Sequence, residues 1–292
     1  ETGRGSSPPA KHKVCINLAG GYRNGMELVL TGLDIEEKAK IFTDTLFNSV
    51  GGREQFDEVS IHLDRNDKDD PNTNEEAMAA LRINVKSKDK ELVGRLFSAK
   101  IIELALSNYP GFFAGGGVKS GGPVLIYWPA LVDSKHINEV VHFNGKSKEL
   151  KPTSQLNFEE IYYQTEPVKI PDAPKGETSY VPLGTLFGAR SGDKGGCANL
   201  GVWAKDLDAF AFLSSFLTIE KLKELMPDLK EFKIERFDLP NILSLNFYIH
   251  DILEDGVSSN SRKDAQAKSL GEYLRAKKAN IPSSLLEALN EY

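Results

Sequence analysis

The sequence of 292 residues has little of several features that would place it in a specialised class of protein. Its two cysteines, Cys15 and Cys197, are too few for the disulfide framework of a small secreted domain. No stretch of about 18 apolar residues occurs, so we expect no membrane-spanning segment. The sequence shows no signal peptide and no Asn-x-Ser/Thr glycosylation acceptor, and we therefore expect a cytoplasmic protein.

Positive charge is also in the minority, because 36 Lys and Arg residues stand against 42 Asp and Glu residues, for a net charge of −6. This balance disfavours a protein that binds nucleic acid through a broad basic surface, although it allows a local anion site. Apolar residues make up 40% of the chain, which is enough to fill a core and argues against disorder. The chain begins at Glu1 rather than Met, so we expect it to be part of a longer protein.

Metal-binding and nucleotide-binding patterns are incomplete. The five histidines show no metal-ligand spacing, so we expect no metal. The acidic run 64–75 approaches a calcium loop, but Lys68 and Asp69 occupy positions that need an oxygen ligand and a glycine. The glycine-rich stretch 111–123 has Ser120 in place of the third glycine of Gly-x-Gly-x-x-Gly and leads into a strand rather than a helix, which argues against a dinucleotide site. A stretch this rich in glycine indicates either a mobile lid or a disordered connection.

The first block, residues 1–150, mixes predicted strands and helices. The apolar runs 14–19 and 26–30, separated by glycine-rich turn signals, predict a β-hairpin. Asp34 followed by Glu37 predicts a helix start with a capping box. Further strands are expected at 56–63, 80–85, 124–128 and 139–143, and an amphipathic helix at 89–107. We expect this block to be the incomplete C-terminal part of a larger α/β domain.

A proline-rich linker at 151–177, with a short helical piece near 158–163, separates this block from a second domain at 178–292. In that domain we expect strands at 180–188, 197–204, 232–238 and 241–250, and helices from 218, over 263–276 and after Pro282. The β-β-α-β-β-α order predicts a compact sheet with its helices on one face. The whole chain is therefore expected to be of the α+β class.

The densest chemical signal is the segment 188–196, which carries four glycines between two expected strands. Glycines allow successive N–H groups to converge on an anion, and Arg190 and Lys194 add positive charge. The segment does not fit a P-loop. The alternative is a long hairpin turn in which Asp193 forms an ion pair with Lys194 or Arg190.

Strand 241–250 strengthens the case for a ligand site. Its alternation places Ser244, Asn246, Tyr248 and His250 on one face, and strand 197–204 brings Cys197, Asn199, Gly201 and Trp203 together. Such a face can bind a ligand, pack on another domain or subunit, or simply face solvent. Cys197 is a candidate nucleophile, and Asp251 next to His250 could set the histidine's tautomer.

A family resemblance follows from these residues. ARSGDKGGCANLGVWA (189–204) closely resembles the signature of the ferredoxin-like domain of the acyclic terpene utilisation (AtuA) family. DLPNILSLNF (238–247), and Gly256 with Arg262, Asp264 and Lys268, resemble later blocks of that domain. In the first block, GSSPPAKHKV, GGYRNGMELVLTG and VLIYWPALV are similar to the C-terminal part of the family's larger domain, which normally starts upstream.

The family is named for bacterial growth on citronellol and geraniol, whose breakdown runs through branched acyl-CoA thioesters. The resemblance therefore implies a metabolic enzyme acting on a branched acyl-CoA or a related anionic substrate, with no cofactor beyond the CoA moiety and with its reaction type open. Asp193 is the candidate acid/base, and Arg190 and Lys194 are the candidate charge stabilisers. The remaining candidates, assigned to substrate binding, are Ser191, Gly192, Gly195, Asn199 and Asn246.

Two rival functions use the same segment. In the first, the ferredoxin-like domain is an assembly module and Ser191 to Gly195 form a structural turn. In the second, the protein senses acyl-CoA without turnover. Beyond the small-molecule substrate, the expected partners are further copies of the chain or an upstream N-terminal half, and neither nucleic acid nor a membrane.

Overall fold

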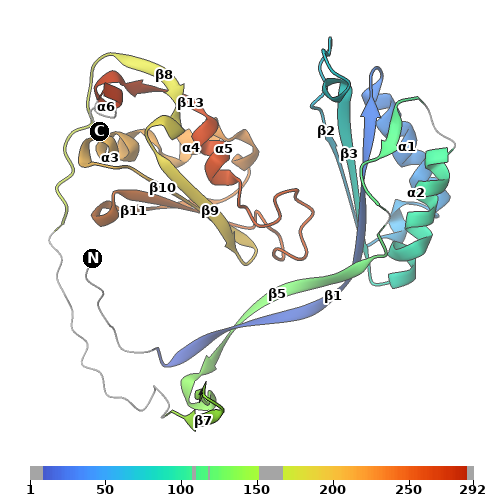
Figure 1. The fold of residues 1–292 in the computed structure, drawn as a ribbon, viewed down its shortest axis with the longest axis horizontal. Helices are drawn as coiled ribbons and strands as arrows, with labels where there is room; N and C mark the ends of the chain where they lie inside the picture. The colour runs from blue at the N-terminus through green and yellow to red at the C-terminus, as the bar shows by residue number, and fades with distance from the viewer. Residues whose placement is uncertain (1–8, 107–109, 118, 151–166, 288–292) are drawn as a thin grey trace. The chain divides into compact units, whose positions relative to one another are not determined.

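The computed structural model describes residues 9–106, 110–117, 119–150 and 167–287. The chain forms two compact units, one of residues 18–126 and the other of residues 1–17 and 127–292. Both combine helices with β-sheets, which confirms the α+β class (Figure 1). The sequence-based domain boundary at residue 150 stays a prediction. In the described part of the chain, no helix has the length and apolar character needed to cross a membrane.

The unit of residues 18–126 is built on a five-stranded sheet with two helices on one of its faces (Figure 1). The strands run in the order β2-β3-β1-β4, and β5 pairs with β1. The elements are β1 (Lys11–Thr31), α1 (Ile35–Ser49), β2 (Glu58–Asp64), β3 (Met78–Ser87), α2 (Phe97–Leu106), β4 (Phe112–Ala114) and β5 (Gly122–Asp133), of which β1 begins before residue 18 and β5 ends after residue 126. Alternate residues of β3 are buried, and they form one core with apolar side chains of both helices.

The predicted hairpin at the start of the chain is wrong, because residues 11–31 form the single strand β1. The glycines of β1 do not form a turn; they allow neighbouring groups to approach the strand backbone closely. A Cβ on Gly25 would lie 2.2 Å from Asn84 Oδ1 across the ladder. The buried Asn24 side chain donates hydrogen bonds to the Val93 carbonyl at 2.7 Å and to Ser98 Oγ at 2.9 Å. Tertiary contacts of these residues therefore keep the chain extended where local signals indicate a turn.

Of the two helices of this unit, only the first begins where the sequence predicts. Helix α1 starts directly after Asp34, but the expected capping box is absent, because Asp34 has φ 58° and its side chain makes no capping hydrogen bond. The amphipathic helix expected over 89–107 is interrupted at Gly94, whose ψ of −123° is not helical, and α2 begins only at Phe97. The glycine-rich stretch 111–123 contains β4 and the start of β5, so part of it belongs to the sheet.

The second unit holds a four-stranded antiparallel sheet in the order β11-β12-β10-β9. Its elements are β6 (Val140–Phe143), β7 (Lys146–Glu149), β8 (Thr178–Pro182), β9 (Gly188–Lys194), β10 (Cys197–Trp203), α3 (Leu207–Phe216), α4 (Ile219–Leu225), β11 (Ile234–Leu239), β12 (Ser244–Ile249), α5 (Leu270–Ala276), β13 (Lys278–Pro282) and α6 (Ser283–Glu287). Strands β9 to β12 and their helices follow the predicted β-β-α-β-β-α order except that two helices, α3 and α4, stand between β10 and β11 where one was predicted. A two-stranded sheet of β8 and β13 completes the unit.

One face of the four-stranded sheet packs on the helices. Alternate residues of β10 and β12, such as Leu200 and Phe247, are fully buried in a core with residues of α3 such as Phe210. Helix α3 was missed in the sequence because its residues are apolar on several sides, although Asp206 caps its first turn by accepting a hydrogen bond from the Ala209 N–H at 2.8 Å. The opposite face of the sheet is not covered by these helices.

Three further predictions need correction or fall outside the described residues. The strand expected at 180–188 is two strands, β8 and β9, separated by a helical turn that buries Leu183. The helix expected over 263–276 begins only at residue 270. The helical piece near 158–163 lies outside the described residues, and residues 167–177 form neither helix nor strand.

Candidate functional site

The segment predicted to be a glycine-rich loop is a strand with a tight turn at its end. Residues 188–194 form β9 and pair with β10 in register from Gly188 opposite Trp203 to Lys194 opposite Cys197. Only Gly195 and Gly196 form the turn, and Gly195 has the positive φ of 68° that favours glycine. The prediction of a loop over residues 188–194 is therefore wrong, because these residues form an edge strand that pairs with β10.

Strand alternation then separates the predicted site residues. Ser191 faces the helices and is buried, and its Oγ accepts a hydrogen bond from the Gly271 N–H of α5 at 3.0 Å. Asp193 lies on the same side, with its Oδ1 3.8 Å from Lys268 Nζ. Arg190 and Lys194 lie on the other side and are exposed. The expected convergence of carboxylate and cations thus does not occur, and Asp193 pairs with neither of the partners considered from the sequence.

The uncovered face of the four-stranded sheet brings the other candidates together. We call it the open face and define it by three rows of paired residues running from β11 through β12 and β10 to β9. The rows are Leu239, Ser244, Trp203 and Gly188; Phe237, Asn246, Gly201 and Arg190; and Glu235, Tyr248, Asn199 and Gly192. The structure therefore places Arg190, Gly192, Asn199 and Asn246 on one surface, as the alternation of the strands predicts.

The centre of the open face is a floor made by two glycines. Gly201 pairs with Arg190, and Gly192 pairs with Asn199, so the glycines occupy diagonal positions on neighbouring strands. The nearest atom to a Cβ built on Gly201 is 3.6 Å away, and that on Gly192 meets only Lys268 Nζ, at 3.4 Å. Beside this floor, Asn199 Nδ2 donates a hydrogen bond to Asn246 Oδ1 at 3.3 Å. A ligand can thus approach the backbone closely here and find amide groups next to it.

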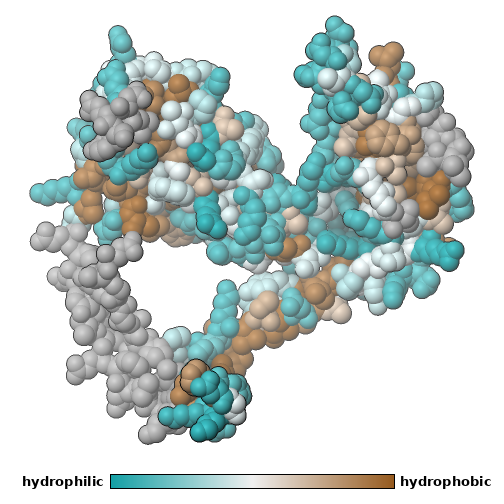
Figure 2. Space-filling view, in the orientation of Figure 1, coloured by the Kyte–Doolittle hydropathy of each residue, from teal (hydrophilic) through white to brown (hydrophobic). Residues whose placement is uncertain are grey.

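One end of the open face is apolar. Large hydrophobic side chains remain exposed there, with Trp203 43%, Phe237 47%, Leu239 41% and Ile242 65% accessible. The indole of Trp203 lies over Gly188, where a Cβ would come within 2.3 Å of the ring. In Figure 2, hydrophobic residues reach the surface of this unit close to β11. An exposed apolar patch of this kind indicates a surface that binds a ligand or a partner.

The other end of the open face carries titratable side chains. His250 follows β12, and its Nε2 lies 2.8 Å from Glu235 Oε1 on β11. The Tyr248 ring packs edge-on against His250, with 4.9 Å between ring centroids. A hydrogen bond with the Cys197 side chain, together with burial, raises the pKa of Tyr248 to about 12. Sequence reasoning missed Glu235 as the partner of His250, because cross-strand pairing of β11 with β12 decides it; Asp251 next to His250 has φ 56° and leaves the strand.

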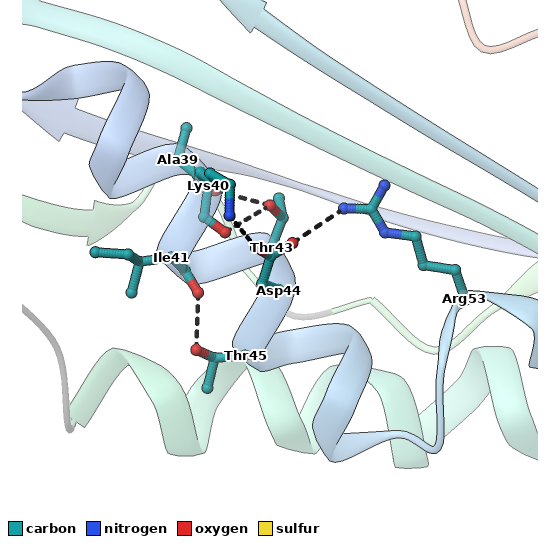
Figure 3. A network of polar contacts seen from close by, with 7 residues as sticks. All are labelled: Ala39, Lys40, Ile41, Thr43, Asp44, Thr45 and Arg53. Carbon is teal, nitrogen blue, oxygen red and sulfur yellow. Dashed lines mark hydrogen bonds and ion pairs between the residues drawn. The ribbon is translucent and has the colours of Figure 1, made fainter.

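A second group of charged side chains lies on α1 in the other unit. Asp44 accepts a hydrogen bond from Lys40 Nζ at 2.8 Å and lies 3.5 Å from Arg53, while the Thr43 and Thr45 hydroxyls donate to carbonyls one turn earlier (Figure 3). The hydrogen bond from Lys40 is the largest contribution that lowers the pKa of Asp44. These bonds link neighbouring residues at the surface of the unit, so we read them as helix-stabilising pairs rather than as a binding site.

The acidic run 64–75 does not assemble a calcium loop. Asp64 forms an ion pair with Arg82 at 2.9 Å, and Asp67 forms an ion pair with Arg65 at 2.7 Å. Over the described ranges, no group of three or more His, Cys, Asp or Glu side chains is placed to hold a metal ion.

These features define an α+β protein whose four-stranded sheet has a helix-covered face and an open face with a cationic edge. Two family models match the chain. Residues 1–143 match the acyclic terpene utilisation family protein AtuA, and residues 181–280 match the AtuA ferredoxin-like domain. The chain therefore belongs to the acyclic terpene utilisation family. Neither the curated proteins nor the solved structures contain a match to it.

Proposed function

We propose that the protein is an enzyme of branched acyl-CoA breakdown and that the open face binds its substrate. One observation carries this proposal: a single surface joins a cationic edge, a glycine floor with amide side chains, and an apolar end. An acyl-CoA ester has the matching parts, namely phosphates, an amide-bearing arm and a hydrocarbon group. The chain's family is named for acyclic terpene utilisation, and the acyl-CoA assignment itself is our proposal.

The cationic edge would bind the anionic part of the substrate. Arg190 and Lys194 are both exposed and lie on the same side of β9, about 13 Å apart along the strand, with Gly192 between them. The planar guanidinium of Arg190 can hold a phosphate or carboxylate with two parallel hydrogen bonds, and Lys194 adds a point charge. Because β9 is the edge strand of its sheet, both side chains can reach a ligand without displacing another strand.

The floor and the apolar end would bind the rest of the molecule. The amides of Asn199 and Asn246 can exchange hydrogen bonds with the amide groups of the CoA arm. The branched hydrocarbon would pack on Trp203 and Phe237, whose exposure in the free protein leaves apolar surface for it to cover. Asp193 and Ser191, on the opposite side of β9, would support the strand rather than touch this substrate.

Calorimetric titration with isovaleryl-CoA, free coenzyme A and isovalerate tests the proposal. We expect Arg190→Ala and Lys194→Ala each to weaken binding of both CoA compounds by roughly 10- to 100-fold, the loss of a charge-assisted hydrogen bond. Lys230→Ala is the matched control, since Lys230 is exposed in the same unit but follows a helical turn away from the open face. Unchanged affinity in both open-face variants would contradict the proposal.

A second function is favoured by the exposure of Trp203, Phe237, Leu239 and Ile242. These side chains could pack on another protein surface, which would make the domain an assembly module. Sedimentation of the same variants, together with Phe237→Ser, separates the two functions. Loss of an oligomer without any change in ligand binding would support assembly, and binding without turnover of the ester would support an acyl-CoA sensor.

A further inference from the structure

We propose that Lys268 is a third substrate-binding cation, which together with Arg190 and Lys194 makes the edge of β9 a site for a ligand with several phosphoryl groups. The inference rests on the proposed function for its ligand, a coenzyme A ester, and deepens that function in two ways. It adds a residue from the loop before α5, and it assigns the diphosphate of the ligand to that residue.

The Lys268 ammonium lies at the outer edge of β9. Its Nζ is 3.8 Å from Asp193 Oδ1, on the side of the strand that faces the helices. The same Nζ is 3.4 Å from the position of a Cβ built on Gly192, which belongs to the open face. Because β9 is the edge strand of its sheet, a side chain can pass around it in this way. Lys268 therefore brings a positive charge from the helix side to the open face.

The local backbone holds Lys268 in place. The Asp264 carboxylate accepts hydrogen bonds from the N–H groups of Lys268 at 2.8 Å and of Ser269 at 2.7 Å. Ala267, directly before Lys268, is buried and has φ 51°, a conformation that is unfavourable for residues other than glycine. Such a conformation persists only where surrounding contacts enforce it, and it occurs often at functional sites. The fold thus sets the backbone of Lys268, while 61% of its side chain stays exposed to a ligand.

The start of α5, which follows this loop, is fixed to β9. The Gly271 N–H donates a hydrogen bond to Ser191 Oγ at 3.0 Å. A Cβ on Gly271 would come within 3.2 Å of the Arg190 backbone, so the helix lies directly against the strand. The backbone of Lys268 is therefore held beside the strand that carries the other two cations.

The three cations form a row along the edge of β9. Arg190, Gly192 and Lys194 lie on the same side of the strand, and the Lys268 ammonium lies at Gly192, about 7 Å along the strand from each of the other two positions. Separate positive charges in a row match a ligand with more than one phosphoryl group better than a single carboxylate. Coenzyme A is such a ligand, because it carries a diphosphate and a separate 3′-phosphate on its ribose.

The middle position suits the diphosphate, because a diagonal path across the open face ends there. Phe237 pairs with Asn246 across β11 and β12. Asn246 accepts the hydrogen bond from Asn199, which pairs with Gly192 of β9. The strand spacings make this path about 16 Å long. A coenzyme A ester along it has its hydrocarbon at Phe237, the amides of its arm at the two asparagines, and the diphosphate that ends the arm at Lys268.

Calorimetric titration of the full chain with coenzyme A, with dephospho-coenzyme A, which lacks the 3′-phosphate, and with pantetheine, which lacks every phosphate, tests the assignment. We expect Lys268→Ala to weaken binding of the first two by the same factor, roughly 10-fold, the loss of one charge-assisted hydrogen bond. Binding of pantetheine should not change. The effect should shrink at high salt, because exposed charges are screened. Lys268→Arg should keep most of the affinity, and Lys230→Ala is again the matched control.

Asp193→Asn separates a binding role of Lys268 from a structural one. This change removes the carboxylate that pairs with the Lys268 ammonium. If Lys268 contacts the ligand, the affinity for coenzyme A should stay the same or rise, because the ammonium keeps its charge and loses a competing anion. A loss as large as that in Lys268→Ala would show that the ion pair acts by holding β9, which would overturn the inference. Circular dichroism and thermal unfolding of each variant establish that it is folded.

The outcomes distinguish this inference from the proposed function. Weaker binding in Arg190→Ala and Lys194→Ala, without any loss in Lys268→Ala, would overturn the inference and leave the proposed function standing. A larger loss for coenzyme A than for dephospho-coenzyme A would overturn the assignment of Lys268 to the diphosphate. Binding of inorganic pyrophosphate that depends on Lys268, in a chain that does not bind coenzyme A, would overturn the proposed substrate and leave the phosphate site.

Discussion

The indole of Trp203 lies so close over Gly188 that a Cβ at position 188 would sit 2.3 Å from its ring. The two residues face each other across the β9–β10 ladder, at the apolar end of the open face. Glycine at position 188 is therefore a condition for the indole to lie this close to β9. A change at position 188 should therefore also affect substrate binding, because the hydrocarbon group of the proposed substrate would pack on Trp203.

Gly188→Ala should displace the Trp203 indole from the sheet. Because the indole is 43% exposed and can swing into solvent, we expect a loss of stability of only about 1–2 kcal/mol. In a Trp128→Phe background, the fluorescence of Trp203 should shift to longer wavelength, and urea unfolding gives the stability. Gly192→Ala is the control, since its Cβ would meet only the end of Lys268 at 3.4 Å. An unchanged emission spectrum in Gly188→Ala would show that the indole is held elsewhere.

Ser191→Ala should destabilise the second unit. The buried Oγ accepts the Gly271 N–H, and its removal leaves that donor without a partner at the start of α5, which costs about 1–3 kcal/mol. Urea unfolding followed by circular dichroism measures the difference. Ser244→Ala serves as the comparison, because its hydroxyl donates to the Ile242 carbonyl at the surface, and we expect a change of less than about 0.5 kcal/mol. Equal effects of the two changes would argue against a structural role for Ser191.

Asp264 should make the stability of this unit depend on pH. Burial raises its pKa, but hydrogen bonds from the Ser269 hydroxyl and from the N–H groups of Ser269 and Lys268 outweigh burial and lower it below the usual value of 3.8. A carboxyl group whose pKa falls on folding stabilises the native state above its unfolded pKa, and that stability is lost as the pH drops through the folded pKa.

Asp264→Asn should therefore reduce stability at pH 7 and flatten the decline in stability below about pH 4. Thermal unfolding of the variant and the parent across pH 2–7 measures both effects. The exposed Asp69 provides an Asn control that should keep the parent profile. Parallel pH profiles for parent and Asp264→Asn would contradict the assignment.

Tyr248 should titrate well above the ordinary tyrosine value of about 10. Its hydrogen bond with Cys197 is the largest cause of a pKa near 12, and burial adds to it. Carbon-13 labelling of the tyrosine Cζ atoms lets the resonance be followed by NMR up to high pH. In Cys197→Ala we expect the Tyr248 pKa to fall toward its ordinary value of about 10, and in Cys15→Ala to stay where it is. An equally high Tyr248 pKa in Cys197→Ala would show that Cys197 is not its cause.

Local patterns in the sequence predict much of the second unit. The alternation in 241–250 places Asn246 and Tyr248 on one face of a strand, and β12 has that arrangement. Thr218 caps α4 and Pro227 follows its end, as expected. The failures come where a local signal competes with a tertiary contact. Gly25 resembles a turn residue but sits inside β1 because Asn84 lies against it, and Gly188 resembles part of a loop but makes room for Trp203.

The candidate site divides in the same way. In any strand, successive side chains point to opposite sides because of backbone geometry alone. If residues 188–194 form a strand, the sequence by itself therefore determines that Arg190 and Lys194 share one side. Ser191 and Asp193 then share the other. Only the tertiary structure decided that this segment is a strand, since this depends on its pairing with β10. The tertiary structure also brings Glu235 of β11 to His250. It places Arg190 and Lys194 on the side of β9 away from Asp193, next to the amides of Asn199 and Asn246. Strand order and register join residues far apart in the chain, and no local pattern encodes them.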